Sequence, residues 1–517
     1  MKTIGNYVFT SNPYQNPYCG SSFTGLKFAS GSQLETIGDY AFGGKSTGMT
    51  GDITIPSTVR TIGESAFNWL GASSMNGSLT LGGGESLDIG AYAFYNCGFN
   101  GNLTLLNGVS SIGNYAFQNA SKLTGSLIIP GSVKTIGANG FASCQGFRSL
   151  QFAEDSVLTS IGNNAFTSWL NVTGDITIPK TVQTIGDSAF YSWRRTNDFV
   201  ASNPDTNFNL TLGSGDKDYP LMVGGNAFYG LYYTGTLTLL EGVTQLGKSN
   251  YGTVFSGSHF TGPLVIPSSM RLIGQNVFSN CTGFTSLTIK EGEVAKDENG
   301  TLIAEKDANG VLIKGLEICY GAFYNCTGMT GDLIVPDSVI TLDYMAFNGC
   351  TGFDGDFVVT RNWTSPYPTF PYVYSSNFKN IYVPIVKNLY ASYSFNSCTL
   401  KNTTTIYAPE GLNLGNSANA ANIERYTDYA SLKAKIGDKY PWRDDTESYS
   451  ISAPESDPIM EEPQTIEEAP DEEEPTEEDI DKKIEEPVTE ILSEESEPDT
   501  EEPTEESSEE ETQEPSP

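Results

Sequence analysis

The most reactive side chains in this sequence are eight cysteines and one histidine, His259. Six of the cysteines each follow a recurring phenylalanine by three residues: Cys97, Cys144, Cys281, Cys326, Cys350 and Cys398. We expect no metal site, because no Cys-x-x-Cys pair occurs and one histidine cannot complete a ligand set. Free, buried thiols are the expected state, since unpaired cysteine is readily buried. A disulfide between neighbouring repeats, such as Cys326 with Cys350, is the alternative.

No catalytic motif stands out in the sequence. His259 lies in Ser258-His259-Phe260, which we interpret as a turn between repeats. No recurring or isolated motif sets a nucleophile beside a base, or two carboxylates side by side. We therefore predict a protein that is not an enzyme and that uses no cofactor.

Aromatic residues in three long stretches are the first candidates for ligand binding. These stretches interrupt the spacing of the phenylalanines, so we expect them to protrude as loops. The first holds Trp193 and Arg194, and the second has Asn309-Gly310, which favours a hairpin turn between residues 301–304 and 311–314. The third carries Trp363, Tyr367, Phe370, Tyr372 and Tyr374. Exposed aromatic side chains would contact a protein or a glycan. Alternatively, they pack back on the molecule and cover an irregular repeat.

A regular repeat must position all of these residues. The pattern Ile-Gly-x-x-Ala-Phe ends at Phe42, Phe67, Phe94, Phe117, Phe166 and Phe190. Relaxed copies end at Phe9, Phe141, Phe228, Phe255, Phe278, Phe323, Phe347 and Phe395. The common spacing of 23 to 27 residues predicts a solenoid of fourteen coils.

Each repeat also contains a short strand. Alternating apolar residues in segments 173–179 and 330–336 give one buried face, Gly supplies the turn before it, and Pro ends it. Stacking such strands at about 4.8 Å produces continuous ladders of Ile and Phe. The fold class we predict is a leucine-rich-repeat-like solenoid of short parallel β-strands with little helix.

Charge divides the chain into unequal parts. Of a net charge of −35, most comes from the segment after Arg443, which has 32 acidic residues against Lys482 and Lys483. We expect the solenoid over residues 1–405, a C-terminal cap over 406–442 with a helix at 422–436, and a disordered tail rich in Glu, Pro, Thr and Ser over 443–517. The acidity disfavours nucleic acid and anionic membrane surfaces as partners.

The repeat resembles the BspA-like class of leucine-rich repeats. The resemblance is carried by Ile-Pro, Ser-Val and Ile-Gly in residues 129–137, and by Val-Pro-Asp-Ser-Val at 335–339 followed by Ala346-Phe347 and Cys350. It covers residues 1 to about 405 and recurs in register. Members of this class are surface or secreted proteins associated with adhesion to host matrix proteins and other cells.

The resemblance implies a cell-surface or extracellular protein that binds protein or glycan. An intracellular or secreted scaffold that assembles other proteins is the alternative. No basic and apolar leader, membrane-spanning run or wall-sorting signal is present in the printed sequence, so localisation rests on the resemblance. Because Met1 to Phe9 already lie inside a repeat, we expect either a truncated chain or an atypical gene start.

Overall fold

The computed structural model describes residues 1–9, 24–44, 49–71, 75–193, 207–231, 233–296, 302–303, 305–308, 312–343, 345–359, 377–382, 402–410, 414 and 422–436. All of them belong to one unit of the chain, Met1–Ile451, and Ser452–Pro517 form a second unit. The predicted acidic tail therefore lies outside the described residues.

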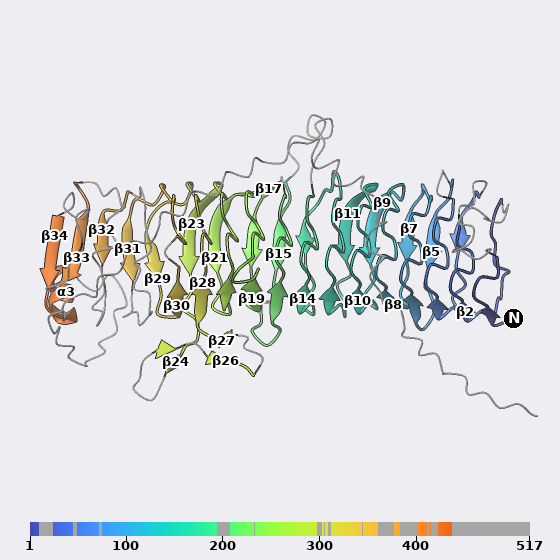
Figure 1. Cartoon of the computed structure of the whole chain (residues 1–517), viewed down its shortest axis with the longest axis horizontal. Helices are drawn as coiled ribbons and strands as arrows, with labels where there is room; N and C mark the ends of the chain where they lie inside the picture. The colour runs from blue at the N-terminus through green and yellow to red at the C-terminus, as the bar shows by residue number, and fades with distance from the viewer. Residues whose placement is uncertain are drawn as a thin grey trace, which may run out of the picture. The chain divides into compact units, whose positions relative to one another are not determined.

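Each coil contributes one strand to a parallel sheet of thirteen strands, which we call the long sheet (Figure 1). Its strands are β1 (Thr3–Ile4), β2 (Thr36–Ile37), β4 (Thr61–Ile62), β6 (Leu87–Ile89), β8 (Val109–Ile112), β10 (Thr135–Ile136), β12 (Ser160–Ile161), β14 (Thr184–Ile185), β16 (Leu221–Val223), β19 (Val243–Leu246), β22 (Leu272–Ile273), β28 (Leu316–Ile318) and β30 (Val339–Leu342). Equivalent residues pair, as in the register of Ile37 with Ile62 and of Ile62 with Ile89. Every coil therefore buries the same side of its strand.

The opposite side of the solenoid is a sheet divided into separate groups, which we call the segmented sheet. Its groups are β3 (Ile53–Thr54), β5 (Leu79–Leu81) and β7 (Leu103–Leu105); β9 (Gly125–Ile129) and β11 (Phe147–Phe152); β13 (Ile176–Thr177), β15 (Leu210–Leu212) and β18 (Leu237–Leu239); β21 (Gly262–Ile266) and β23 (Phe284–Ile289); and β29 (Leu333–Val335), β31 (Asp356–Val359), β32 (Asn380–Tyr382), β33 (Thr405–Pro409) and β34 (Asn422–Tyr426). A parallel pair, β17 (Thr234–Gly235) and β20 (His259–Phe260), accompanies them. His259 thus lies in a short strand, and the interpretation of its segment as a turn was wrong.

The predicted fold class is confirmed. Thirteen of the fourteen expected coils contribute a strand to the long sheet, and Phe395, the marker of the fourteenth, lies outside the described residues. The strand expected before Pro336 is present as β29, which ends at Val335. Helix is minor in the described part of the chain, as predicted.

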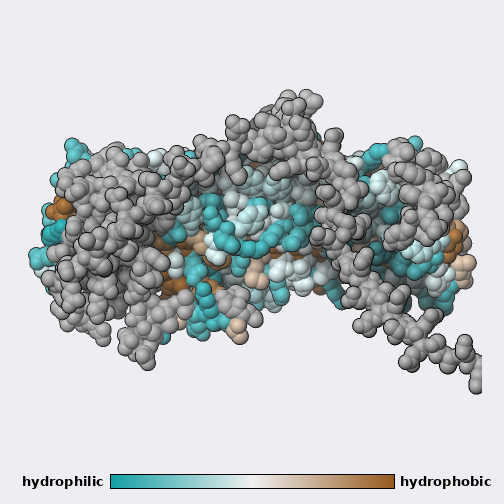
Figure 2. All heavy atoms as spheres, viewed as in Figure 1, coloured by the Kyte–Doolittle hydropathy of each residue, from teal (hydrophilic) through white to brown (hydrophobic). Residues whose placement is uncertain are grey.

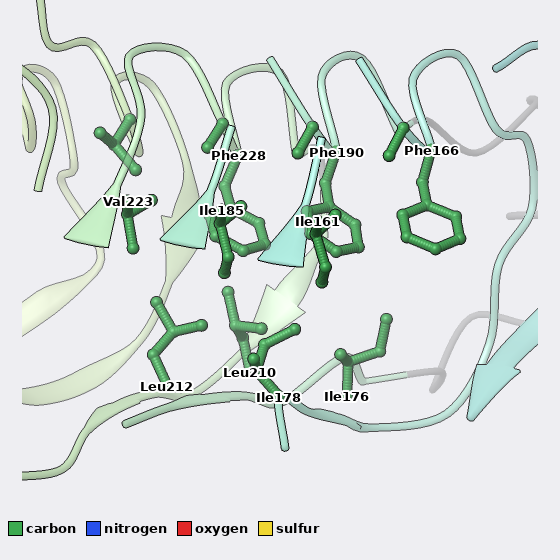
Figure 3. Packing of buried hydrophobic residues seen from close by; sticks show 14 of the residues in the cluster. Ile161, Phe166, Ile176, Ile178, Ile185, Phe190, Leu210, Leu212, Val223 and Phe228 are labelled. Atoms are coloured by element: carbon green, nitrogen blue, oxygen red, sulfur yellow. The ribbon is translucent and has the colours of Figure 1, made fainter. Parts of the chain in front are cut away.

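The core between the two sheets is a stack of phenylalanine rings flanked by aliphatic side chains (Figure 3). Ring centroids of successive repeat phenylalanines lie 4.8 to 5.5 Å apart from Phe9 to Phe347. In Figure 3, Phe166, Phe190 and Phe228 line up behind the strands of the long sheet. Because one coil cannot bury its own apolar side, each ring is covered by its neighbours, and the solenoid is stable only as a stack.

The glycine of Ile-Gly is required by the close approach of successive coils. A Cβ atom on Gly137 would lie 2.6 Å from the backbone nitrogen of Asn114 and 2.7 Å from the carbonyl carbon of Gly113. Gly5 holds the same position in the first coil, and there the nearest atom would be a methyl of Val8 at 3.6 Å. The Ile-Gly motif therefore reflects contact between coils.

The second interrupted stretch forms two small antiparallel ribbons. One pairs β24 (Ala295–Lys296) with β25 (Leu302–Ile303), and the other pairs β26 (Glu305–Lys306) with β27 (Leu312–Lys314). In Figure 1 they lie to one side of the strand stack, beside β28. The predicted hairpin around Asn309-Gly310 is confirmed for its second strand, residues 312–314. That strand pairs with β26 and not with residues 301–304, because residues 302–303 pair with β24. The turn itself lies outside the described residues.

Arg271 ties the second ribbon to the solenoid. Its Nε donates to the carbonyl of Ile313 at 2.8 Å, and its Nη1 donates to the carbonyls of Ser268 and Met270, each at 2.9 Å. Lys306 and Glu317 add an ion pair at 3.5 Å between β26 and β28. These contacts hold the ribbon beside the long sheet.

The segmented sheet extends past residue 405. β33 pairs in parallel with β32 and β34, so Asn422–Tyr426 form a strand and the helix predicted over 422–436 begins later. The helix is α3 (Tyr429–Ile436). Asp428 caps it, since its Oδ1 accepts the N–H of Ser431 at 2.7 Å while Ser431 Oγ accepts the N–H of Asp428 at 3.1 Å. This reciprocal cap fixes the start of the helix.

Candidate interaction surface

Every coil turns sharply at its Ala-Phe motif, and we call the residues from three before to two after the phenylalanine the corner. Around Phe166, for example, Asn164 and Ser168 both have left-handed backbones, with φ of 55° and 59°. Their N–H groups donate to carbonyls of the next coil, to Asp187 at 2.9 Å and to Tyr191 at 2.9 Å. Asn, Ser and Gly suit these two positions because they tolerate positive φ best.

Some polar corner residues have a purely structural role. Asn163 Oδ1 accepts the N–H of Asp187 at 2.9 Å, and Asp187 Oδ1 accepts the N–H of Gly225 at 2.8 Å. Lys248 Nζ lies 2.7 Å from Asp187 Oδ2. Side chains directly after the Ile-Gly glycine therefore bridge one coil to the next, and we do not regard them as binding residues.

The described cysteines that follow the phenylalanine by three residues are buried in the core, and Cys398 lies outside the described residues. Cys144, Cys281, Cys326 and Cys350 are free thiols, and each donates from Sγ to the carbonyl of a phenylalanine in the preceding coil at 2.9 to 3.0 Å. The expectation of buried, free thiols is confirmed for the described cysteines at this position, Cys97, Cys144, Cys281, Cys326 and Cys350, while Cys319, elsewhere in the repeat, is free and partly buried. Burial raises the pKa of Cys97 to about 12 and that of Cys281 to about 11, so both stay protonated at neutral pH.

Trp193 occupies this same interior position. It is fully buried, and its Nε1 donates to the carbonyl of Phe166 at 2.5 Å. Its ring stacks on Trp169, with 5.4 Å between ring centroids. The prediction that Trp193 lies in a protruding loop was wrong, because the residue is part of the ladder that fills the core. It is unavailable to a ligand at the surface.

The other predicted binding residues lie outside the described residues. These are Arg194, Trp363, Tyr367, Phe370, Tyr372 and Tyr374. They stay predictions.

Four aromatic side chains form a contiguous group on the surface of the corners, which we call the aromatic cluster: Trp69, Tyr92, Tyr95 and Tyr115. Tyr92 stacks on Tyr115 of the next coil, with centroids 4.6 Å apart and planes 3° from parallel. Tyr95 meets Tyr92 at 5.6 Å and Trp69 at 6.0 Å, with planes inclined by 72° and 73°. All four side chains are partly exposed. The cluster thus spans three successive coils outside the hydrophobic core.

Three members of the cluster are held in a backbone conformation that suits them poorly. Trp69, Tyr92 and Tyr115 have φ of 58°, 54° and 58°. The equivalent positions of most later described coils carry Asn, Ser or Gly, for example Asn139 and Asn280, and the exceptions are Thr253 and Met345. A bulky residue at positive φ costs of order 1–3 kcal/mol, and such outliers gather where a site depends on them. The backbone conformation alone would favour Asn at all three positions.

The Tyr92 phenol of the cluster is uncharged at neutral pH. Partial burial, with the neighbouring hydroxyls of Tyr115 and Tyr95 and the carboxylate of Glu64, raises the pKa of the Tyr92 phenol. Tyr92 therefore remains a neutral hydrogen-bond donor. Amide side chains border it, since Asn68, Tyr95 and Gln118 hold the same position in consecutive coils.

The sheet faces offer less to a partner. Outward residues of the segmented sheet are largely threonines, such as Thr54, Thr80 and Thr104 on paired strands. The face shown in Figure 2 is mainly hydrophilic over the central coils. Among the described residues, no group of three or more His, Cys, Asp or Glu could hold a metal ion, and none of the helices is long and apolar enough to cross a membrane.

A model of BspA-type leucine-rich repeat regions matches the chain in six copies, over residues 2–78, 87–209, 221–307 and 309–422. The chain belongs to this family. In this chain, the BspA-type repeat therefore includes the phenylalanine stack, the close Ile-Gly contacts between coils and the interior Cys position.

A comparison with solved structures finds matches of low identity to this BspA-type chain. The pneumococcal vaccine antigen PcpA is 16% identical over 79% of this chain and 94% of its own, with a TM-score of 0.39. A leucine-rich repeat protein from Bacteroides ovatus is 19% identical over 73% of this chain and 92% of its own, with a TM-score of 0.33. A leucine-rich cell surface protein from Faecalibacterium prausnitzii is 19% identical over 74% and 89%, with a TM-score of 0.27. No curated protein matches the chain.

The aromatic cluster is not among the residues predicted from the sequence, because binding residues were expected only in stretches that break the repeat. The cluster lies inside regular BspA-type repeats. A signal was present: tyrosine directly precedes Ala41, Ala93 and Ala116, whereas the coils from Phe141 to Phe347 have Asn, Ser, Thr, Gly or Met at this position. Comparing the variable positions of aligned repeats would have identified it.

Proposed function

We propose that this chain is a cell-surface or secreted adhesion protein whose solenoid holds a binding surface for a partner on other cells or in the host matrix. The observation that carries the proposal is the aromatic cluster. Tyr and Trp dominate the energetics of many protein interfaces because they combine large contact area with few rotatable bonds. Three bulky residues kept at positive φ, a backbone conformation that favours Asn, support a role in binding.

The architecture supports the same proposal. Inter-coil hydrogen bonds and the phenylalanine stack fix the corners, so little conformational entropy is lost when a partner binds. Membership of the BspA-type family supports it further, because solenoids of stacked repeats present extended surfaces suited to binding. The interior is filled by apolar side chains and hydrogen-bonded thiols, which fits a binding protein better than an enzyme.

A second contact is proposed for the segment with Trp363, Tyr367, Phe370, Tyr372 and Tyr374, together with Arg194. The support is compositional, since aromatic side chains and Arg are enriched at interface hot spots. This contact is independent of the aromatic cluster and is tested separately.

The experiment measures binding of the full chain at physiological salt to a panel of immobilised extracellular-matrix proteins and to intact cells. Two variants are compared with the native chain: Trp69→Asn/Tyr95→Gln in the cluster, and Trp363→Ala/Tyr367→Ala in the second segment. Saturable binding that falls about tenfold or more in the cluster variant supports the proposal. An absence of binding to every coat and cell by the folded native chain overturns it and favours the scaffold.

A further inference from the structure

The ring orientations in the aromatic cluster suit a ligand laid along the solenoid. Tyr92 and Tyr115 stack across two coils, so their faces point along the solenoid and cover each other. Tyr95 is inclined by 72° to Tyr92 and by 73° to Trp69, so it meets both rings edge to face and is not part of a parallel stack. Its neighbours at the same repeat position are Asn68 and Gln118, which are amides and do not stack on it as a ring would. Tyr95 is also partly exposed, so part of its ring is available for contact with a ligand.

The charges around the cluster select against an ionic ligand. At the described corner positions of the first five coils, the charged residues are Asp39 and Glu64, and both are acidic. Asp39 is used within the solenoid, since its Oδ1 accepts the N–H of Glu64 at 2.9 Å and its Oδ2 accepts from Asn6 Nδ2 at 3.0 Å. Sulfated or carboxylated ligands would meet like charge, and one remaining carboxylate is a poor match for a strongly basic protein patch.

The spacing of polar groups suits a chain with many hydroxyls. Corners recur at the strand spacing of about 4.8 Å, so amides and phenols form a regular row along the solenoid. Asn and Gln side chains each donate and accept hydrogen bonds, and phenols do the same. Aromatic faces carry partial negative charge and attract the C–H groups of a sugar ring. Neutral sugars combine apolar C–H faces with hydroxyl edges and match both features.

Building on the proposed function, we propose that the aromatic cluster binds a neutral glycan chain lying along the solenoid. Sugar rings rest on Tyr95 and Trp69, and the hydroxyl groups of the glycan hydrogen-bond with Asn68, Gln118 and the Tyr92 phenol. The partner of the adhesion protein is then a neutral glycan, either free or carried on a glycoprotein.

The test uses the full chain and neutral hexasaccharides of glucose, N-acetylglucosamine and mannose, with heparin as the sulfated comparison. The variant Trp69→Asn/Tyr95→Gln exchanges each aromatic residue for one that the repeat uses at the same position, so the fold is kept. Tyr324→Gln, at the position equivalent to Tyr95 in a distant coil, is the matched control. We expect binding to at least one neutral hexasaccharide, with affinity reduced about tenfold or more in the double variant and unchanged in the control.

Three results would overturn the inference: no binding to any neutral hexasaccharide, equal binding by the double variant, or binding to heparin alone. A second arm uses a glycoprotein coat before and after enzymatic removal of its glycans. Cluster-dependent binding that survives deglycosylation refutes a glycan ligand and leaves the adhesion proposal intact. If the native chain binds neither form of this coat, no neutral hexasaccharide, and no matrix protein or cell of the panel, both proposals are refuted.

Discussion

Cys144 and Trp169 lie in adjacent coils at the same repeat position, and each donates a hydrogen bond to a phenylalanine carbonyl in the core. The Cys144 thiol donates to Phe117 at 3.0 Å, and Trp169 Nε1 donates to Phe141 at 2.8 Å. A thiol and an indole differ greatly in volume, but both are largely apolar. Each has a single hydrogen-bond donor, which is weak in the thiol. This repeat position therefore favours a buried side chain that donates one hydrogen bond. The presence of a thiol there needs no redox function to explain it.

We predict from this relationship that Cys144→Val lowers the free energy of unfolding by about 1 kcal/mol, the net value of one lost hydrogen bond. The volume of the side chain changes little, so cavity effects are small. Urea denaturation followed by circular dichroism measures the change. An unchanged midpoint would show that the thiol contributes only its volume.

The buried thiols also predict a dependence of stability on pH. Burial raises the pKa of Cys281 to about 11, above its value in the unfolded chain. The unfolded chain therefore loses this proton first, and stability falls as the pH rises from about 9 towards 11. Cys281→Ala should flatten this part of the profile. The prediction fails if unfolding midpoints of native chain and variant change in parallel between pH 8 and pH 11.

Replacement of a ladder phenylalanine should be severe. Phe141 is fully buried between Phe117 and Phe166, and Phe141→Ala is expected to cost about 3–5 kcal/mol. Tyr324→Ala is the comparison, since Tyr324 is 38% exposed and should cost less than about 1 kcal/mol. Similar losses in the two variants would contradict the description of the core.

Gly137 and Gly5 hold the same repeat position and give a matched test of the contact between coils. Gly137→Ala introduces a methyl group against the backbone of the preceding coil, and we expect a loss of about 1–3 kcal/mol or more. Gly5→Ala meets only a methyl of Val8 and should change stability by less than about 1 kcal/mol. Thermal unfolding of both variants checks the difference. Equal effects would show that the coils do not pack as closely as described.

Tyr92→Asn separates folding from binding. Relief of the positive-φ strain offsets the lost stacking on Tyr115, so stability should change by less than about 1 kcal/mol. Binding should weaken in the same variant. A stability loss above about 2 kcal/mol would show that the ring serves the fold.

The repeat pattern was sufficient to predict the solenoid, its parallel strands and the interior cysteines. Ile62 and Phe67 recur at nearly constant spacing, and only stacked coils bury such residues together. The sequence misled where a local signal competed with stacking. Residues 422–426 have a helical composition but pair with β33, and Trp193 follows the last regular corner before an insertion yet fills a core position. The aromatic cluster depends on which way individual rings face, and periodicity does not report this.

Oxidative footprinting of tyrosine and tryptophan in the full chain, free and bound to a partner from the binding panel, tests the account most directly. We predict that Trp69, Tyr92, Tyr95 and Tyr115 lose reactivity on binding, while Tyr324 keeps its reactivity and the buried Trp169 and Trp193 stay unreactive throughout. If the four residues remain fully reactive in the saturated complex, the binding surface lies elsewhere and the account is wrong.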